Sequence, residues 1–85
     1  MKRRQYRTLL KLFAARTSGN ISWHEVLALF RELGAEIDDR KPGSRVLIVL
    51  RGEPRVIHRP HPRPTLSRAQ VDSIRDWLES LGIKP

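Results

Sequence analysis

The sequence predicts an α+β fold, in which helices cover one face of a three-stranded antiparallel sheet. Three observations support this fold class. Apolar residues recur at helical spacing near both ends of the chain, a β-branched stretch fills the middle, and turn-forming residues separate these regions. Because 85 residues have room for only one hydrophobic core, we expect a single domain over residues 1–85.

A first helix is expected over about residues 5–16, because its apolar residues fall at i, i+3, i+4 and i+7. This stripe consists of Tyr6, Leu9, Leu10 and Phe13. We expect the stripe to pack the helix against the rest of the domain. Residues 17–20 read Thr-Ser-Gly-Asn, a run of turn formers that ends the helix.

Two further helices have clear start signals. Ser22 with Glu25, and Ser67 with Gln70, each match the capping-box pattern. An apolar stripe follows each of them and ends before a glycine, which is the usual stop signal of a helix. The two stripes consist of Val26, Leu29, Phe30 and Leu33, and of Val71, Ile74, Leu78 and Leu81.

The middle of the chain predicts a β-hairpin. Residues 44–50 and 55–58 are rich in β-branched and apolar side chains, and a glycine-containing turn near residues 51–54 separates them. Residues 35–39 are expected to add a third strand at the edge of the hairpin. Prolines at positions 60 and 62 then end regular strand pairing.

The position of the turn gives an expected register. With the turn near residues 51–54, facing residues have numbers that add to about 104, which sets His58 across from Val46 and beside Arg45. A slip of one residue would turn His58 to the opposite face of the sheet.

The charge of the chain indicates an anionic partner. Lys and Arg outnumber Asp and Glu by 17 to 9, which gives a net charge of +8. Two basic blocks, residues 1–20 and 40–63, flank an acidic segment over residues 21–39. Clustered basic residues favour nucleic acid as the partner, and a solvated surface with no such partner is the alternative interpretation.

Several classes of protein are excluded by composition. The chain has no cysteine, so it has neither disulfides nor thiolate metal ligands, and this usage suits a cytoplasmic protein. No apolar run approaches the roughly 20 residues that a membrane span needs. Gly-rich phosphate loops and metal-ligand spacings are also missing, so we expect no cofactor, no metal site and no membrane partner.

The segment from Ile57 to Arg63 carries the remaining candidate chemistry. His58 and His61 can exchange protons near neutral pH, and arginine binds phosphate through two donors. Together such residues can cleave RNA without a metal, although histidines at strand ends are commonly surface or capping residues. The candidate phosphate contacts are Lys41, Arg45, Arg59 and Arg63.

Other polar and aromatic residues have simpler interpretations. His24 lies inside the first capping box and is expected to be a structural or surface residue. Phe30 is expected in the core. Trp23 and Trp77 could stack on bases or fill the core, and the sequence leaves both open.

From about Ile21 to Ile83, roughly three quarters of the chain resembles the HicA family, the small mRNA-cleaving toxins of toxin–antitoxin pairs. The resemblance rests on the order and spacing of three short stretches. These are Gly43-Ser44-Arg45-Val46, then Val56-Ile57-His58-Arg59-Pro60-His61-Pro62, and then Val71-Asp72-Ser73-Ile74 through Leu81-Gly82-Ile83.

The resemblance implies a fold like that of a double-stranded-RNA-binding domain. This fold has the order α-β-β-β-α over residues 21–85, here with an additional basic helix in residues 1–20. The resemblance also implies metal-independent cleavage of mRNA, which inhibits translation, and neutralisation by a HicB-type antitoxin. One position departs from the family pattern: the catalytic histidine of the family follows Gly-Ser, where this chain has Arg45.

Because arginine cannot accept a proton at neutral pH, we expect His58 to replace the missing histidine, with Arg45 holding phosphate. The leading hypothesis is a toxin-type endoribonuclease with His58 and His61 as catalytic residues. A non-catalytic RNA- or DNA-binding module on the same fold is the alternative. A third hypothesis is an interaction protein whose basic face binds an acidic partner.

Overall fold

The computed structural model describes residues 1–14 and 20–85. Its elements are α1 (Arg3–Phe13), α2 (Trp23–Glu32), β1 (Glu36–Asp38), β2 (Arg45–Leu50), β3 (Glu53–His58) and α3 (Arg68–Ser80). The expected α+β fold, with α-β-β-β-α order and an added helix in front, is confirmed, and it is consistent with a double-stranded-RNA-binding-like fold. The turn expected over residues 17–20 lies almost wholly outside the described residues.

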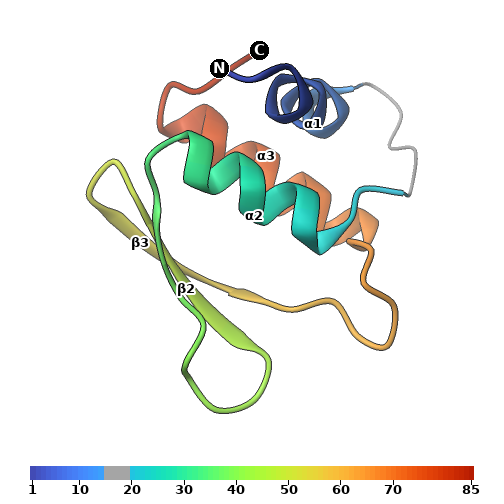
Figure 1. The fold of residues 1–85 in the computed structure, drawn as a ribbon, viewed down its shortest axis with the longest axis vertical. Helices are drawn as coiled ribbons and strands as arrows, with labels where there is room; N and C mark the ends of the chain where they lie inside the picture. Colours follow the sequence, from blue (N-terminus) through green and yellow to red (C-terminus); the bar gives the residue numbers. More distant parts are fainter. Residues whose placement is uncertain (15–19) are drawn as a thin grey trace.

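The molecule is built in three layers (Figure 1). The strands form one antiparallel sheet in the order β1-β2-β3, with β2 in the centre. Helices α2 and α3 lie next to each other over one face of this sheet, and α1 packs across them on the side away from the sheet. The other face of the sheet has no helix over it (Figure 1).

Both predicted capping boxes are present. The Ser22 hydroxyl accepts a bond from the Glu25 N–H at 3.1 Å, and the Glu25 carboxylate accepts one from the Ser22 N–H at 3.1 Å. Ser67 and Gln70 exchange the same two bonds at 3.1 and 3.0 Å. These bonds satisfy N–H groups that the first turn of a helix leaves without partners, so α2 and α3 start where the sequence predicts.

The hairpin register differs by one residue from the expected one. Facing residues add to 103, so His58 pairs with Arg45, and Val46 pairs with Ile57. The cause is a tighter turn than expected, with only Arg51 and Gly52 between the strands, at φ of 52° and 79°. Positive φ at both positions is typical of a two-residue type I′ turn, whose twist matches that of the strands.

Alternate residues of β2 fill the core beneath the helices. Val46, Ile48 and Leu50 are fully buried, whereas their neighbours in β2 face the side of the sheet away from the helices. Both tryptophans are buried as well, with Trp77 packing edge-on against Phe30 at a centroid distance of 6.0 Å. Core packing is therefore the role of Trp23 and Trp77, and neither is available to stack on bases.

Helix α1 packs on the domain as expected, but the face it buries is only partly the expected one. Thr8, Leu9 and Leu12 face the rest of the protein, whereas Tyr6 and Leu10 are 44% and 46% exposed. The expected stripe is half right: Leu9 is buried and Phe13 packs partly buried against the core, whereas Tyr6 and Leu10 are exposed. The first helix has apolar side chains on more than one side, and periodicity alone does not show which side packs. No helix within residues 1–14 and 20–85 is long and apolar enough to cross a membrane.

Candidate RNA-binding and catalytic site

The candidate site lies at the end of the hairpin where β2 starts and β3 stops. Arg45 and His58 face each other directly in the register, and both side chains are exposed. Because Val46 and Ile57 point into the core, Arg45 and His58 point to the open face of the sheet. The Cβ atoms of facing residues lie roughly 4.5–5.5 Å apart, so an imidazole and a guanidinium share one small surface.

Ser44 contacts the imidazole of His58. The Oγ of Ser44 lies 2.9 Å from His58 Nδ1, and the hydroxyl can either donate to this nitrogen or accept from it. This contact leaves Nε2 as the ring nitrogen without a protein partner among the described residues. The sequence pattern did not reveal this contact, because it depends on the exact register of the hairpin.

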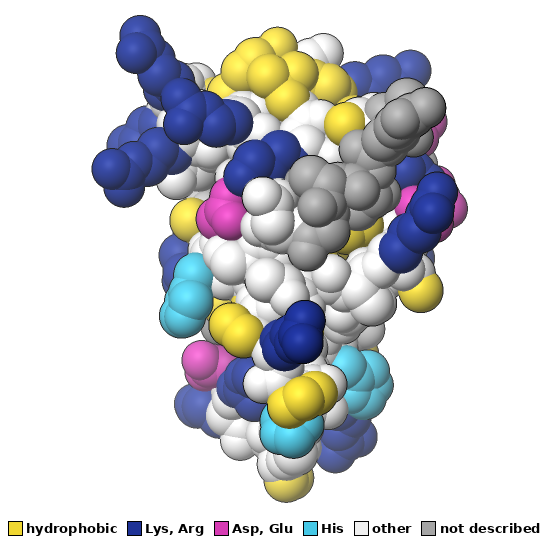
Figure 2. Space-filling model, turned by 90° about the vertical axis from the view of Figure 1, so that its right-hand side faces the viewer, with side chains coloured by type: hydrophobic (Ala, Val, Ile, Leu, Met, Phe, Trp, Pro, Cys, Tyr) yellow, Lys and Arg dark blue, Asp and Glu magenta, His cyan; other side chains and the backbone are white. Residues whose placement is uncertain are grey.

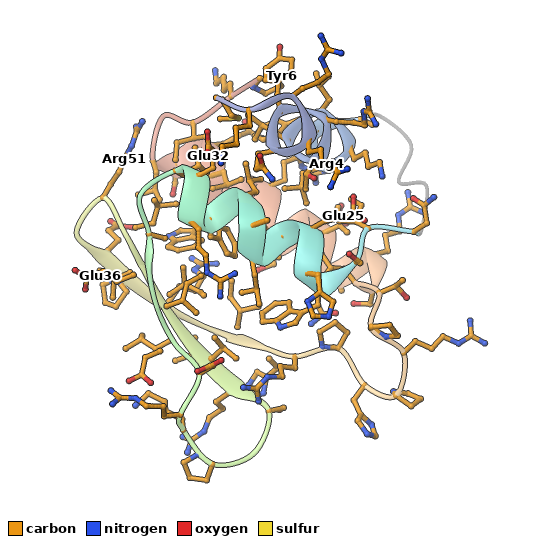
Figure 3. The ribbon with its side chains drawn as sticks, viewed as in Figure 1. Arg4, Tyr6, Glu25, Glu32, Glu36 and Arg51 are labelled. Carbon is orange, nitrogen blue, oxygen red and sulfur yellow. The ribbon has the colours of Figure 1, made fainter. Side chains whose placement is uncertain are left out.

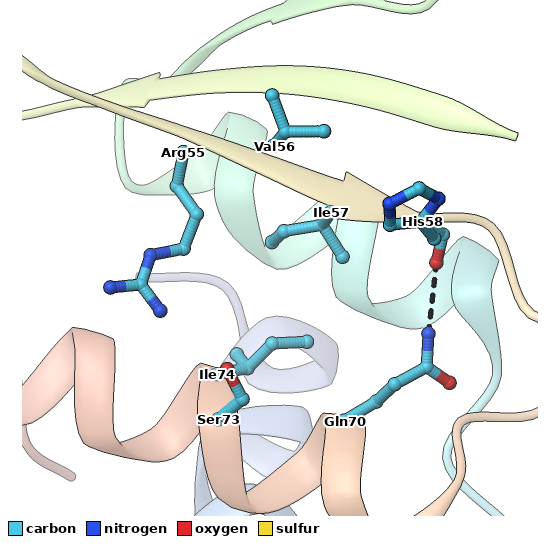
Figure 4. Close-up of a pocket in the computed structure, with 7 residues that line it drawn as sticks. All are labelled: Arg55, Val56, Ile57, His58, Gln70, Ser73 and Ile74. Carbon is cyan, nitrogen blue, oxygen red and sulfur yellow. Dashed lines mark hydrogen bonds between the residues drawn. The ribbon is translucent and has the colours of Figure 1, made fainter.

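Gln70, in the first turn of α3, forms a hydrogen bond with the backbone of His58. Its Nε2 donates to the His58 carbonyl oxygen at 2.8 Å (Figure 4). Between β3 and α3 lies a groove of about 430 Å³, with Ile57 and Ile74 pointing into it. The imidazole of His58 points away from α3, at one end of this groove (Figure 4). Gln70 thus links the start of α3 to the candidate catalytic residue, a role that the capping-box pattern did not reveal.

Arg59 braces the loop between β1 and β2. Its guanidinium donates to the carbonyl oxygens of Asp39 at 3.0 Å and Gly43 at 3.2 Å, and its N–H donates to the Ser44 carbonyl at 2.8 Å. These bonds fix the loop that carries Ser44 up to the hairpin. Part of the donor capacity of Arg59 is therefore used inside the protein, while its role as an RNA contact stays a prediction.

The proline-rich loop that carries His61 is fastened to the start of α2. The Trp23 N–H donates to Pro64 O at 2.8 Å, and the Leu66 N–H donates to Ile21 O at 2.9 Å. His61 lines a separate hollow of about 260 Å³, which shares only Gln70 with the groove beside His58. Across the described residues, no hydrogen bond or ring contact joins the two imidazoles.

Histidine and basic side chains gather on one face of the molecule (Figure 2). The lower half of this face carries histidines, and Lys and Arg side chains lie above and between them (Figure 2). The candidate residues Lys41, His61 and Arg63 are exposed, and so is His24, which was expected to be a structural or surface residue. Exposed cations beside exposed imidazoles are suited to a polyanion that also presents groups for proton transfer.

One basic residue of this region is already neutralised. The Arg40 guanidinium hydrogen-bonds to the Asp38 carboxylate, with Nε–Oδ1 at 3.1 Å, and this bond holds the pKa of Asp38 below its ordinary value. Arg45 makes no ion pair with any carboxylate of the described residues. Within residues 1–14 and 20–85, no group of three or more His, Asp or Glu side chains is arranged to hold a metal ion.

Comparison with known proteins identifies the family. The family model described as the HicA toxin of bacterial toxin–antitoxin matches residues 23–83. The chain belongs to the HicA toxin family. Neither the curated proteins nor the solved structures include a significant match.

The HicA match spans everything from the first residue of α2 to the segment after α3, and so includes Ser44, Arg45 and His58. Helix α1 lies outside it. Membership of the HicA family makes this chain a toxin of a toxin–antitoxin pair, with an antitoxin as its partner. The observed register sets His58 directly across from Arg45, the position at which the resemblance to the family leads us to expect a histidine.

Proposed function

We propose that this HicA toxin is a metal-independent endoribonuclease that cleaves mRNA and thereby inhibits translation, with His58 as the general base. The observation that carries the proposal is the pairing of His58 with Arg45 on the open face of the hairpin. A histidine there stands one strand away from the position of the family histidine. Its imidazole therefore reaches the same surface from the neighbouring strand.

Ser44 decides which nitrogen of His58 reacts. When Nδ1 carries the proton and donates it to Ser44 Oγ, the lone pair of Nε2 is free to accept a proton. In the proposed reaction, Nε2 removes the proton of a ribose 2′-hydroxyl. The resulting 2′-oxygen attacks the adjacent phosphorus, the bond from phosphorus to the 5′-oxygen breaks, and a 2′,3′-cyclic phosphate forms.

The leaving 5′-oxygen needs a proton, and we assign this step to His61. Negative charge builds on the phosphate oxygens during the attack, and Arg45 is placed to stabilise it through charge-assisted hydrogen bonds. Lys41 and Arg63 would bind flanking phosphates, as would the donors of Arg59 that the loop does not use. The partner of the toxin in this proposal is a HicB-type antitoxin.

Incubation of the pure protein with RNA, with and without EDTA, tests this function. We expect cleavage at the same rate in both, with products ending in a 2′,3′-cyclic phosphate and a 5′-hydroxyl. Tight RNA binding without cleavage, weakening steeply with salt, would instead assign the chain to the non-catalytic RNA-binding alternative. The exposed, unpaired Arg45 in place of a histidine is the observation that favours this alternative.

A further inference from the structure

A second concave surface lies between α1 and α2. It encloses about 350 Å³, and the polar and charged residues that line it include Arg4, Gln5, Arg7 and Lys11 of α1 and His24 and Glu25 of α2. Figure 3 shows Arg4 and Glu25 at this junction, between the two helices. Because α1 lies outside the residues that the family model matches, this groove exists only through the added helix.

The groove has an excess of positive charge. Glu25 is neutralised within it, since its Oε2 accepts a bond from Lys11 Nζ at 3.2 Å and its Oε1 accepts the capping bond from the Ser22 N–H. Arg4 and Arg7 make no ion pair with the carboxylates of the described residues. Two guanidinium groups at the rim of one groove are suited to an anion with several oxygens, and phosphate is the most common such group.

The side chain of Gln5 contributes to this groove a hydrogen-bond acceptor that has no donor among the described residues. Its Oε1 is buried and has no hydrogen-bond partner among the described residues. A buried acceptor without a donor lowers stability, so such atoms are rare in folded proteins and call for an explanation. Since Gln5 lines the groove, a turn of its amide toward the opening would present this oxygen to a ligand that carries a hydroxyl group.

We propose that the groove between α1 and α2 binds the RNA backbone. Arg4 and Arg7 contact phosphates, and Gln5 accepts a hydrogen bond from a ribose 2′-hydroxyl. RNA presents both groups together at every nucleotide, whereas DNA lacks the hydroxyl. The inference rests on the proposed function in taking RNA as the ligand. Lys, Arg and His side chains are spread over the face in Figure 2, as a backbone of repeating phosphates would need.

Binding of a labelled 20-nucleotide single-stranded RNA, followed by fluorescence anisotropy in EDTA, tests the groove. All variants carry His58→Ala, so that binding is measured without cleavage by this residue. We expect Arg4→Ala/Arg7→Ala to weaken binding about tenfold or more, and to reduce the slope of log K against log salt by about 1 to 2. The matched control, Arg3→Ala/Arg31→Ala, removes the same charge from exposed positions that do not line the groove.

A second variant tests the ribose contact. We expect Gln5→Leu to weaken binding of the RNA and leave binding of the DNA of the same sequence unchanged. Its melting temperature should stay the same or rise, because the unmet acceptor is gone. The proposal is overturned if the double variant binds RNA as tightly as its control, or if Gln5→Leu weakens RNA and DNA equally.

The outcome is separable from that of the proposed function. If the natural protein fails to cleave RNA while the groove variants still lose affinity, the nuclease proposal fails and the groove stands. If the natural protein cleaves RNA while the groove variants keep full affinity, only the groove proposal fails.

Discussion

Three residues of the candidate site have different proposed roles: Ser44, Arg45 and His58. Ser44 orients the imidazole of His58 through a 2.9 Å contact, and Arg45 supplies a fixed positive charge from the neighbouring strand. In the proposed reaction, His58 moves a proton and Arg45 does not. In this proposal, cleavage does not require a histidine at the position of Arg45.

Glu25 illustrates how single contacts tie α1 to α2. Burial by itself would raise the pKa of Glu25, but hydrogen bonds from the Ser22 backbone and from Lys11 outweigh it, so the pKa lies below the ordinary value. A carboxyl group whose pKa is lower in the folded state stabilises the fold above its ordinary pKa. That contribution is lost as the pH falls through the folded-state pKa.

We therefore expect Glu25→Gln to lower the melting temperature at pH 7 by about 1–5 °C, a small effect because the pair is about one third exposed. The difference between the melting temperatures of the variant and the natural protein should shrink as the pH is lowered from 7 to 3. Thermal unfolding followed by circular dichroism at both pH values measures this. An equal difference at pH 7 and pH 3 would mean that the charge of Glu25 contributes nothing.

The sequence predicted some residues of the candidate site but not how they pair. Histidine and arginine chemistry indicated His58 and Arg45 correctly as neighbours, because both belong to one predicted hairpin. Their direct pairing was missed, since Gly52, Glu53 and Pro54 all suit turns and the length of the turn fixes the register. The contact between Ser44 and His58 depends on that register and could not be predicted without it.

One residue of α3, Gln70, both caps the helix and contacts the backbone of His58. The capping box of α3 joins Ser67 to Gln70, and the same Gln70 side chain donates to the carbonyl of His58. Capping boxes are read easily from a sequence because they are local. The second bond of Gln70 joins residues 12 apart in the chain, and only the tertiary fold shows it.

Two variants separate these roles of α3. Ser67→Ala and Gln70→Ala both break the capping box, so each should lower the free energy of unfolding, by about 1 kcal/mol. Only Gln70→Ala also removes the support of His58, and we expect it to reduce the rate of RNA cleavage more than Ser67→Ala does. Urea denaturation and cleavage rates of the two purified variants provide the comparison. Equal rates would show that the bond from Gln70 does not position His58.

Across the whole molecule, α1 is part of the folded domain and forms its third layer. Its inner face is buried against α2 and α3, and the Lys2 backbone N–H donates to Glu32 Oε1 at 3.0 Å. The sequence predicted the helix and its packing, but not which face packs.

A pair of leucine variants in α1 checks this orientation. Leu12→Ala should destabilise the protein by about 2–5 kcal/mol, because Leu12 is fully buried and its loss leaves a cavity. Leu10→Ala should cost less than about 1 kcal/mol, because Leu10 is 46% exposed. Both free energies come from denaturant unfolding. A larger loss of stability for Leu10→Ala than for Leu12→Ala would mean that the side of α1 that carries Leu10 packs against the core.

The central claim is that His58 performs the role of the histidine that Arg45 has replaced. The rate of RNA cleavage in EDTA by three proteins tests it most directly: the natural chain, His58→Ala, and His58→Ala/Arg45→His. We expect His58→Ala to lose about 100-fold or more, as for removal of a general base, and the double variant to recover part of the rate from the facing strand. Cleavage by His58→Ala at the natural rate would contradict the claim.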